Sequence, residues 1–214
     1  MDIAEDALRL ATAADILARV LVDPFTTNLP QIFADPALLE SWPLDDSAST
    51  RGIDTLSQAL TSPDGLGSLE LIKRDHLYLF GGAGKPLACP YESPYVDKDG
   101  LVFDEATFAV RAAYKRFGFQ INNLNREPDD HLGYELAFVS ALCKHLSQYP
   151  QDSDVKKQLD DFVTTHLSAF GYAVAEGIAV HARSPFYLGS AHLLTGLLDK
   201  LRDFTNVEIS VIGQ

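Results

Sequence analysis

In several successive segments of the sequence, apolar residues recur every three or four positions. This spacing limits the fold more than any other feature. The first such segment ends before Asp23-Pro24, and its apolar positions are Ile3, Ala7, Leu10, Ala14, Leu17 and Leu21. Side chains with this spacing lie along one face of an α-helix, and Pro24 ends the run because proline restricts the residue before it. Later segments repeat the pattern up to Leu201, so the sequence predicts helices that each bury one face.

Residues that begin and end helices flank several of these segments. Ser68 can cap a helix over residues 69–80, and Ser184 followed by Pro185 is typical of a helix start. The clearest helix is predicted from Glu105 to Phe117. Its ends are marked by the cap Asp104, the hydrophobic pair Phe103 and Phe108, the basic residues Lys115 and Arg116, and Gly118.

The predicted fold is all-α, a single globular helical domain of about eight or nine helices over residues 1–206. The last residues, 207–214, alternate like a strand, but no convincing partner strand is present, so we expect an extended tail. The longest non-helical connection covers residues 81–100. It is rich in glycine, but Pro86 follows Lys85 where a phosphate-binding loop needs serine or threonine, so no nucleotide loop is predicted.

The composition narrows the class of partner and the compartment. The chain has 17 basic and 30 acidic side chains and a formal net charge of -13, whereas binding of nucleic acid requires the opposite sign. The acidity favours a basic partner, although it can equally serve only to keep the protein soluble. Cys89 and Cys143 match no metal or disulfide framework, and neither a signal peptide nor a membrane-length apolar run is present. We expect a cytoplasmic protein with reduced thiols and no stable membrane insertion.

One stretch near the middle of the chain carries more charge than a helix start needs. It contains Glu127, Asp129, Asp130, His131 and Glu135 within nine positions. We interpret Pro128 as the first residue of a helix, with Glu127 as its cap and the two aspartates in its first turn, where carboxylates complement the helix dipole. His131 and Glu135 then share a face at the margin of the core stripe.

The residue types in this stretch allow more than one function. An acidic helix start suits the binding of guanidinium groups, because carboxylates accept paired hydrogen bonds from arginine. The acids can equally do no more than begin their helix. A metal site fits poorly because no H-E-x-x-H motif or second carboxylate helix accompanies the stretch, and Ser93 is not in a nucleophile elbow, so catalysis is not favoured.

The segment Glu127-Pro128-Asp129-Asp130-His131-Leu132-Gly133-Tyr134-Glu135-Leu136 closely resembles the E-P-x-D-H-x-G-x-E-L segment of the TorD/DmsD family of redox-enzyme maturation chaperones. Two further segments resemble the same family, namely Pro90-Tyr91-Glu92-Ser93-Pro94-Tyr95 and Ala182-Arg183-Ser184-Pro185-Phe186-Tyr187. The resemblance runs from about residue 70 to residue 205, whereas residues 1–68 agree in helical character and carry no matching motif.

The resemblance implies a TorD-like cytoplasmic chaperone, not an enzyme. Such a chaperone binds the precursor of a molybdoenzyme of the dimethyl-sulfoxide-reductase class, together with its twin-arginine leader, until the molybdopterin cofactor is inserted and export is allowed. The leader-binding residues that it implies are Glu127, Pro128, Asp130 and His131, with Tyr91 and Ser93 as contributors, and we add Asp129 and Glu135 from the same cluster.

Several alternatives stay open at this point. The chain could be a metal-binding helical enzyme that uses the cluster from Glu127 to His131, or a plain assembly subunit. Members of the family have been linked to guanine nucleotides and to molybdopterin, but the sequence has a motif for neither, so no cofactor is assigned. The identity of the client and the oligomeric state, including a domain-swapped homodimer, are also left open.

Overall fold

The computed structural model describes residues 2–81, 84–96, 105–121 and 128–205. These residues form eleven α-helices and one π-helical turn, and an isolated antiparallel bridge joins Tyr91 to His131. The elements are α1 (Ile3–Val22), α2 (Leu29–Phe33), α3 (Pro36–Glu40), α4 (Ser47–Leu60), α5 (Leu69–Phe80), α6 (Ser93–Val96), α7 (Glu105–Phe117), α8 (Leu132–Gln148), α9 (Ser153–Phe162), η1 (Val163–Leu167), α10 (Ser168–His181) and α11 (Pro185–Thr205).

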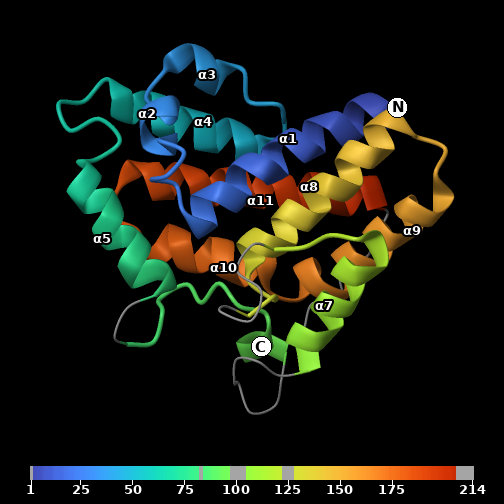
Figure 1. The fold of residues 1–214 in the computed structure, drawn as a ribbon. Coiled ribbons are helices and arrows are strands. Elements are labelled where there is room, and N and C mark those ends of the chain that lie inside the picture. Colours follow the sequence, from blue (N-terminus) through green and yellow to red (C-terminus); the bar gives the residue numbers. More distant parts are fainter. Residues whose placement is uncertain (1, 82–83, 97–104, 122–127, 206–214) are drawn as a thin grey trace.

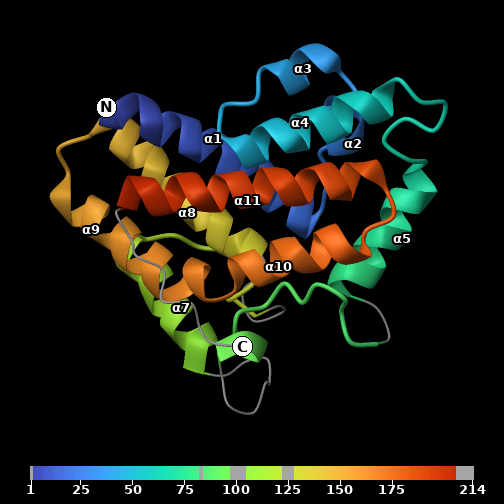
Figure 2. The ribbon, with the colours of Figure 1, turned by 180° about the vertical axis from the view of Figure 1, so that it is seen from behind.

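The long helix α11 lies at the centre of the bundle. Helices α1 and α8 cross on one side of it (Figure 1), and α10 runs beside it when the molecule is seen from behind (Figure 2). Helix α4 packs along α11, α5 stands at one end of the bundle, and α7 and α9 stand at the other. Apolar residues on several sides of α11 are fully buried, as expected of a helix surrounded by others. They include Phe186, Tyr187, Leu193, Leu197 and Leu201.

The all-α prediction is confirmed, and several helix ends lie where the sequence placed them. Helix α1 ends at Val22, α5 begins with Ser68 Oγ accepting a hydrogen bond from Leu71 N at 3.1 Å, and α7 runs from Glu105 to Phe117. The predicted cap Asp104, its neighbour Phe103 and the tail 207–214 lie outside the described residues. No helix in the described part of the chain is both long and apolar enough to cross a membrane.

Helices outnumber the expectation because some segments are short or interrupted. The helices α2, α3 and α6 are each one turn or little more. The helical segment from Val155 to Phe170 is divided by the π-helical turn η1 into α9 and α10. Part of the 81–100 connection is described, and it contains α6.

The predicted start of α8 at Pro128 is wrong. The helix begins at Leu132, and His131 is its N-cap, with an extended backbone and a ring Nδ1 that accepts a hydrogen bond from Gly133 N at 3.0 Å. Long-range backbone pairing sets this boundary. Leu132 N donates to Pro90 O at 2.7 Å, and Glu92 N donates to Asp130 O at 2.9 Å, so the bridge holds His131 extended and the helix begins only after it.

The first turn of α8 is pressed against the last turn of α1, and only glycine fits at the contact. A Cβ atom on Gly133 would lie 2.5 Å from Val22 Cγ2 and 3.0 Å from Ala18 O. This close approach brings the end of α1 beside His131 and so defines one wall of the site described below.

We expect Gly133→Ala to lower the free energy of unfolding by about 1–3 kcal/mol, because the added methyl group overpacks the contact between α1 and α8. Urea unfolding measures the change. Gly84→Ala is the matched control, since nothing lies within 4 Å of a Cβ at Gly84. Adding Val22→Ala should restore part of the loss. A Gly133→Ala variant as stable as the wild type would show that the two helices are not in close contact.

Candidate functional site

The charged motif meets the 90–93 segment through the bridge between Tyr91 and His131. The rings of these two residues contact edge to face, with centroids 5.2 Å apart and planes at 84°. Tyr134, on the first turn of α8, also contacts the imidazole, at a centroid distance of 5.2 Å. The histidine ring therefore packs against two tyrosines.

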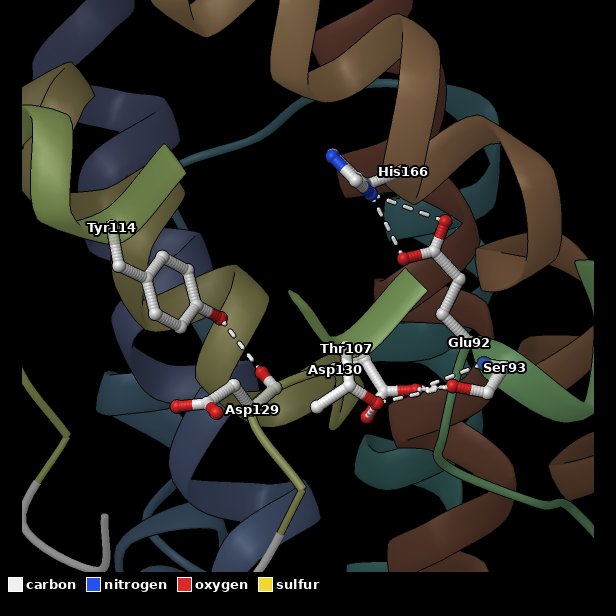
Figure 3. A network of polar contacts seen from close by, with 7 residues as sticks. All are labelled: Glu92, Ser93, Thr107, Tyr114, Asp129, Asp130 and His166. Atoms are coloured by element: carbon white, nitrogen blue, oxygen red, sulfur yellow. Dashed lines mark hydrogen bonds and ion pairs between the residues drawn. The ribbon is translucent and has the colours of Figure 1, made fainter. Parts of the chain in front are cut away.

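The Asp130 carboxylate is fully buried and joins three parts of the chain (Figure 3). One oxygen, Oδ2, accepts hydrogen bonds from Ser93 N at 2.9 Å and from Ser93 Oγ. The other, Oδ1, accepts a hydrogen bond from Thr107 Oγ1 of α7 at 2.9 Å. These donors satisfy the charged group inside the protein, so Asp130 fixes the starts of α6, α7 and α8 relative to one another.

Asp129 is paired with a basic side chain of the same protein. Its exposed fraction is 1%, and its Oδ2 accepts a hydrogen bond from Arg111 Nε at 2.6 Å while the Nη2 of the same guanidinium forms an ion pair with it. Its backbone oxygen accepts the hydroxyl of Tyr114 at 3.1 Å (Figure 3). The charge of Asp129 is thus neutralised by α7.

Two further buried acids lie close to Asp130. The Glu92 carboxylate binds Nδ1 of His166, in η1, at 2.9 Å (Figure 3). Glu135 is fully buried, and neither of its carboxyl oxygens has a hydrogen-bond partner among the described residues. Burial, together with the nearby carboxylates of Glu92 and Asp130, raises the pKa of Glu135 well above its ordinary value.

These contacts correct the expectation that the acids are displayed at a helix margin. Pro128 and Ser93 are buried, and the carboxyl groups of Asp129, Asp130 and Glu135 are turned inward. The physical reason is that the donors for Asp129 and Asp130 come from α6 and α7, which cover them. The remaining predicted residue, Glu127, lies outside the described residues.

His131 and Tyr91 instead line a cavity of about 520 Å³ on the outer side of the motif. Its walls come from the end of α1, from α5 and from the first turn of α8. The lining residues are Leu21, Val22, Asp23, Phe25, His76, Leu77, Phe80, Gly81, Tyr91, His131 and Tyr134. Polar groups and apolar side chains share the accessible lining of this cavity about equally.

Both histidines in this cavity are held neutral. Burial lowers the pKa of His131 to about 3, with a smaller contribution from His76. Burial also lowers the pKa of His76, although Asp23 partly opposes the change, and His76 Nδ1 lies 2.7 Å from the hydroxyl of Tyr187. The bond to Tyr187 holds the His76 ring against α11.

Asp23 supplies the negative charge of the cavity. Burial alone would raise the pKa of this carboxyl, but hydrogen bonds from Thr26 and Phe25 outweigh it and lower the pKa. Sequence reasoning missed Asp23 as a site residue because it read Asp23-Pro24 only as the end of a helix. Nothing in its spacing relates it to His131, since the two meet only through the packing of α1 on α8.

Two other findings concern the chemistry of the described residues. No group of three or more histidine, cysteine, aspartate or glutamate side chains is placed there to hold a metal ion. Cys89 and Cys143 are both free thiols.

Comparisons with known proteins match most of the chain. The family described as nitrate reductase delta subunit matches residues 43–176. A chaperone protein TorD from Vibrio parahaemolyticus is 27% identical over 146 residues, which cover 66% of this chain and 68% of the relative. A chaperone protein TorD from Vibrio vulnificus is 29% identical over 145 residues, which cover 66% of each. A probable Tat proofreading chaperone DmsD from Haemophilus influenzae is 20% identical over 190 residues, 89% of this chain and 86% of the relative.

Replacing Asp130 by asparagine should lower the free energy of unfolding by about 2 kcal/mol, because an amide group then faces hydroxyl donors in place of a carboxylate. A urea double-mutant cycle with Thr107→Val should give a coupling of about 1 kcal/mol. Asp54→Asn, at an exposed position of α4, is the control. Additive effects of the two substitutions would mean that Thr107 does not bind Asp130.

Glu135→Gln should remove a loss of stability that the wild type suffers as the pH rises above 4.5, the ordinary pKa of this group. The folded protein keeps the proton that the unfolded chain releases. The free energy of unfolding of the variant should therefore rise relative to that of the wild type by about 1.4 kcal/mol per pH unit, until the folded-state pKa is reached.

Denaturant unfolding over a range of pH measures this difference. The lowered pKa of His131 acts in the opposite direction below 6.5, but both proteins share it, so their difference isolates Glu135. Glu176→Gln, on the exposed face of α10, should follow the wild type at every pH. If Glu135→Gln also parallels the wild type, the carboxyl group is not buried in its neutral form.

Proposed function

The chain belongs to the TorD/DmsD family of chaperones, and from this premise we propose that it is a cytoplasmic chaperone for the precursor of a molybdoenzyme and the twin-arginine leader of that precursor. The named relatives are chaperones and Tat proofreading chaperones, so the protein is a chaperone and not an enzyme. The curated TorD relatives match over about two thirds of their length, and the client is part of the proposal.

The observation that carries the proposal is the cavity in which His131 faces α5 and the end of α1. A twin-arginine leader has two adjacent guanidinium groups followed by an apolar stretch. Phe25, Leu77 and Phe80 give the cavity apolar walls suited to that stretch. Asp23, which is exposed at the cavity, gives it a carboxylate for a guanidinium group.

The residues of the charged motif have two different roles in this proposal. His131 and Tyr91 contact the leader, since both line the cavity. Pro128, Asp129, Asp130, Glu135 and Ser93 are buried and shape the cavity from behind. Glu127 remains a proposed contact at the start of the motif.

The charge of the whole protein supports the same partner. A formal net charge of -13 attracts a basic leader and raises its rate of encounter. Because Asp23 is exposed, salt should screen its attraction for an arginine.

The alternatives predict different partners. A metal-binding enzyme that uses the cluster from Glu127 to His131 predicts a tightly bound metal at stoichiometric ratio in elemental analysis of the purified protein. A plain assembly subunit would form a stable complex with the mature partner and would be indifferent to the leader.

A synthetic twin-arginine leader from a molybdoenzyme encoded nearby should bind the protein in calorimetry, and His131→Asn should weaken binding by about tenfold or more. Asparagine preserves the N-cap of α8 but removes the imidazole from the cavity. Asp23→Asn should weaken binding by a similar factor and should reduce its dependence on salt, because it removes the charge that the leader arginine meets.

Asp54→Asn is the control for the loss of one negative charge, since it lies on the exposed surface of α4. It should leave the affinity within about twofold of the wild type. The proposal fails if the leader does not bind, or if it binds the His131 and Asp23 variants as tightly as the wild type.

A further inference from the structure

Helix α5 has a second surface, on the side away from the leader cavity, that the proposed function does not use. It surrounds a hollow of about 430 Å³ and brings together Arg74 and Tyr78 of α5, Leu87, Val180 and His181 at the end of α10, and Arg183. We call these six residues the α5–α10 surface. We propose that it docks an acidic amphipathic segment of a protein partner.

The apolar part of this surface is unusually exposed. Tyr78, Leu87 and Val180 have exposed fractions of 57%, 48% and 67%, and all three line the same hollow although they come from three segments of the chain. Large apolar side chains that gather in one hollow, within a charged border, are typical of protein interaction sites.

The border of the surface is basic in a protein that is otherwise acidic. Arg74, His181 and Arg183 are exposed, and no ion pair joins either arginine to an acid within the described part of the chain. The acid that lines the hollow, Asp75, has an exposed fraction of 4%. Its Oδ2 already accepts hydrogen bonds from Arg183 N at 2.9 Å and Ser184 N at 2.6 Å. The two guanidinium groups are thus available to carboxylates of a partner.

The same contacts hold the surface in place before a partner arrives. Asp75 ties residues 183 and 184 to α5, next to Arg74. Leu87 N donates to Tyr78 O at 3.1 Å, and Ala88 N donates to Leu79 O at 2.9 Å, which fixes Leu87 at the end of α5. On the other side, a Cβ on Gly177 would lie 3.0 Å from Ala88 Cβ, so the segment around residue 88 also packs tightly on α10. The segment runs beside this helix in Figure 2. A surface ordered in advance loses little entropy on binding.

The chemistry of the surface selects one kind of partner. An amphipathic segment that carries carboxylates beside apolar side chains matches both the exposed arginines and the exposed apolar side chains of this surface. A basic leader does not match, because its arginines would meet Arg74 and Arg183. A second copy of this chain is the competing occupant, and sedimentation distinguishes it from an acidic segment of another protein.

The test uses the full chain and a pair of fluorescent synthetic helical peptides that share one leucine face. One peptide carries glutamates on its other face, and the second carries lysines at the same positions. In fluorescence anisotropy the acidic peptide should bind at least about tenfold more tightly than the basic one, and added salt should weaken it.

The double variant Arg74→Glu and Arg183→Glu should lower the affinity for the acidic peptide by about tenfold or more. Val180→Ser should lower the same affinity by about fivefold. The matched control is the double variant Arg51→Glu and Arg116→Glu, which changes the net charge equally at exposed positions on α4 and α7. Leu8→Ser, at an exposed position of α1, is the control for Val180→Ser. Both controls should bind the acidic peptide nearly as the wild type does.

Binding of the leader provides an independent readout. His131→Asn should retain the acidic peptide, and the Arg74 and Arg183 double variant should retain the leader, so failure of one proposal is distinguishable from failure of the other. Equal affinity for the two peptides, or unchanged affinity for the acidic peptide in the double variant, would overturn the proposal that the α5–α10 surface docks an acidic segment. A concentration-dependent dimer in sedimentation that Val180→Ser dissociates would also overturn it, since a second copy would then be the occupant.

Discussion

The Asp130 carboxylate is the interaction on which the geometry of the site depends. Its donors come from Ser93 at the start of α6 and Thr107 on α7, while its own backbone pairs with Glu92 just before α8 begins. The bridge to Tyr91 fixes His131 as the N-cap of α8 at the cavity, and the contact of Gly133 with α1 adds the wall that carries Asp23. A buried charge thus determines where a neutral, largely buried ring lines the cavity.

Burying several carboxyl groups together is costly, and the protein reduces that cost in different ways. Asp129 is neutralised by Arg111, Asp130 is satisfied by hydrogen bonds, and Glu92 binds His166. Glu135 has a raised pKa instead, since burial and its neighbours disfavour the charged form. All of these groups are buried, so in the proposed function they hold the cavity wall in one shape.

Sequence reasoning predicted the parts of this structure that local interactions determine. The cap Ser68 and Gly118, with its φ of 74°, mark helix ends because their effect is confined to neighbouring residues. The start of α8 was mispredicted because pairing with residues 90–92 sets it, and no local signal carries that information. The burial of Asp129 and Asp130 was missed for the same reason. Their donors on α6 and α7 meet them only in the folded chain. Asp23 likewise joins the cavity lining only when α1 packs on α8.

The central claim is that the leader meets the neutral His131 in the outer cavity and does not reach the buried acids. The most direct measurement is a two-dimensional NMR titration of the histidine rings with a twin-arginine leader peptide. The ring signals of His131 and His76 should shift and saturate together, while those of His166, buried against Glu92, should stay in place. A shift of the His166 ring with His131 unchanged would contradict the account, because the leader would then enter among the buried carboxylates.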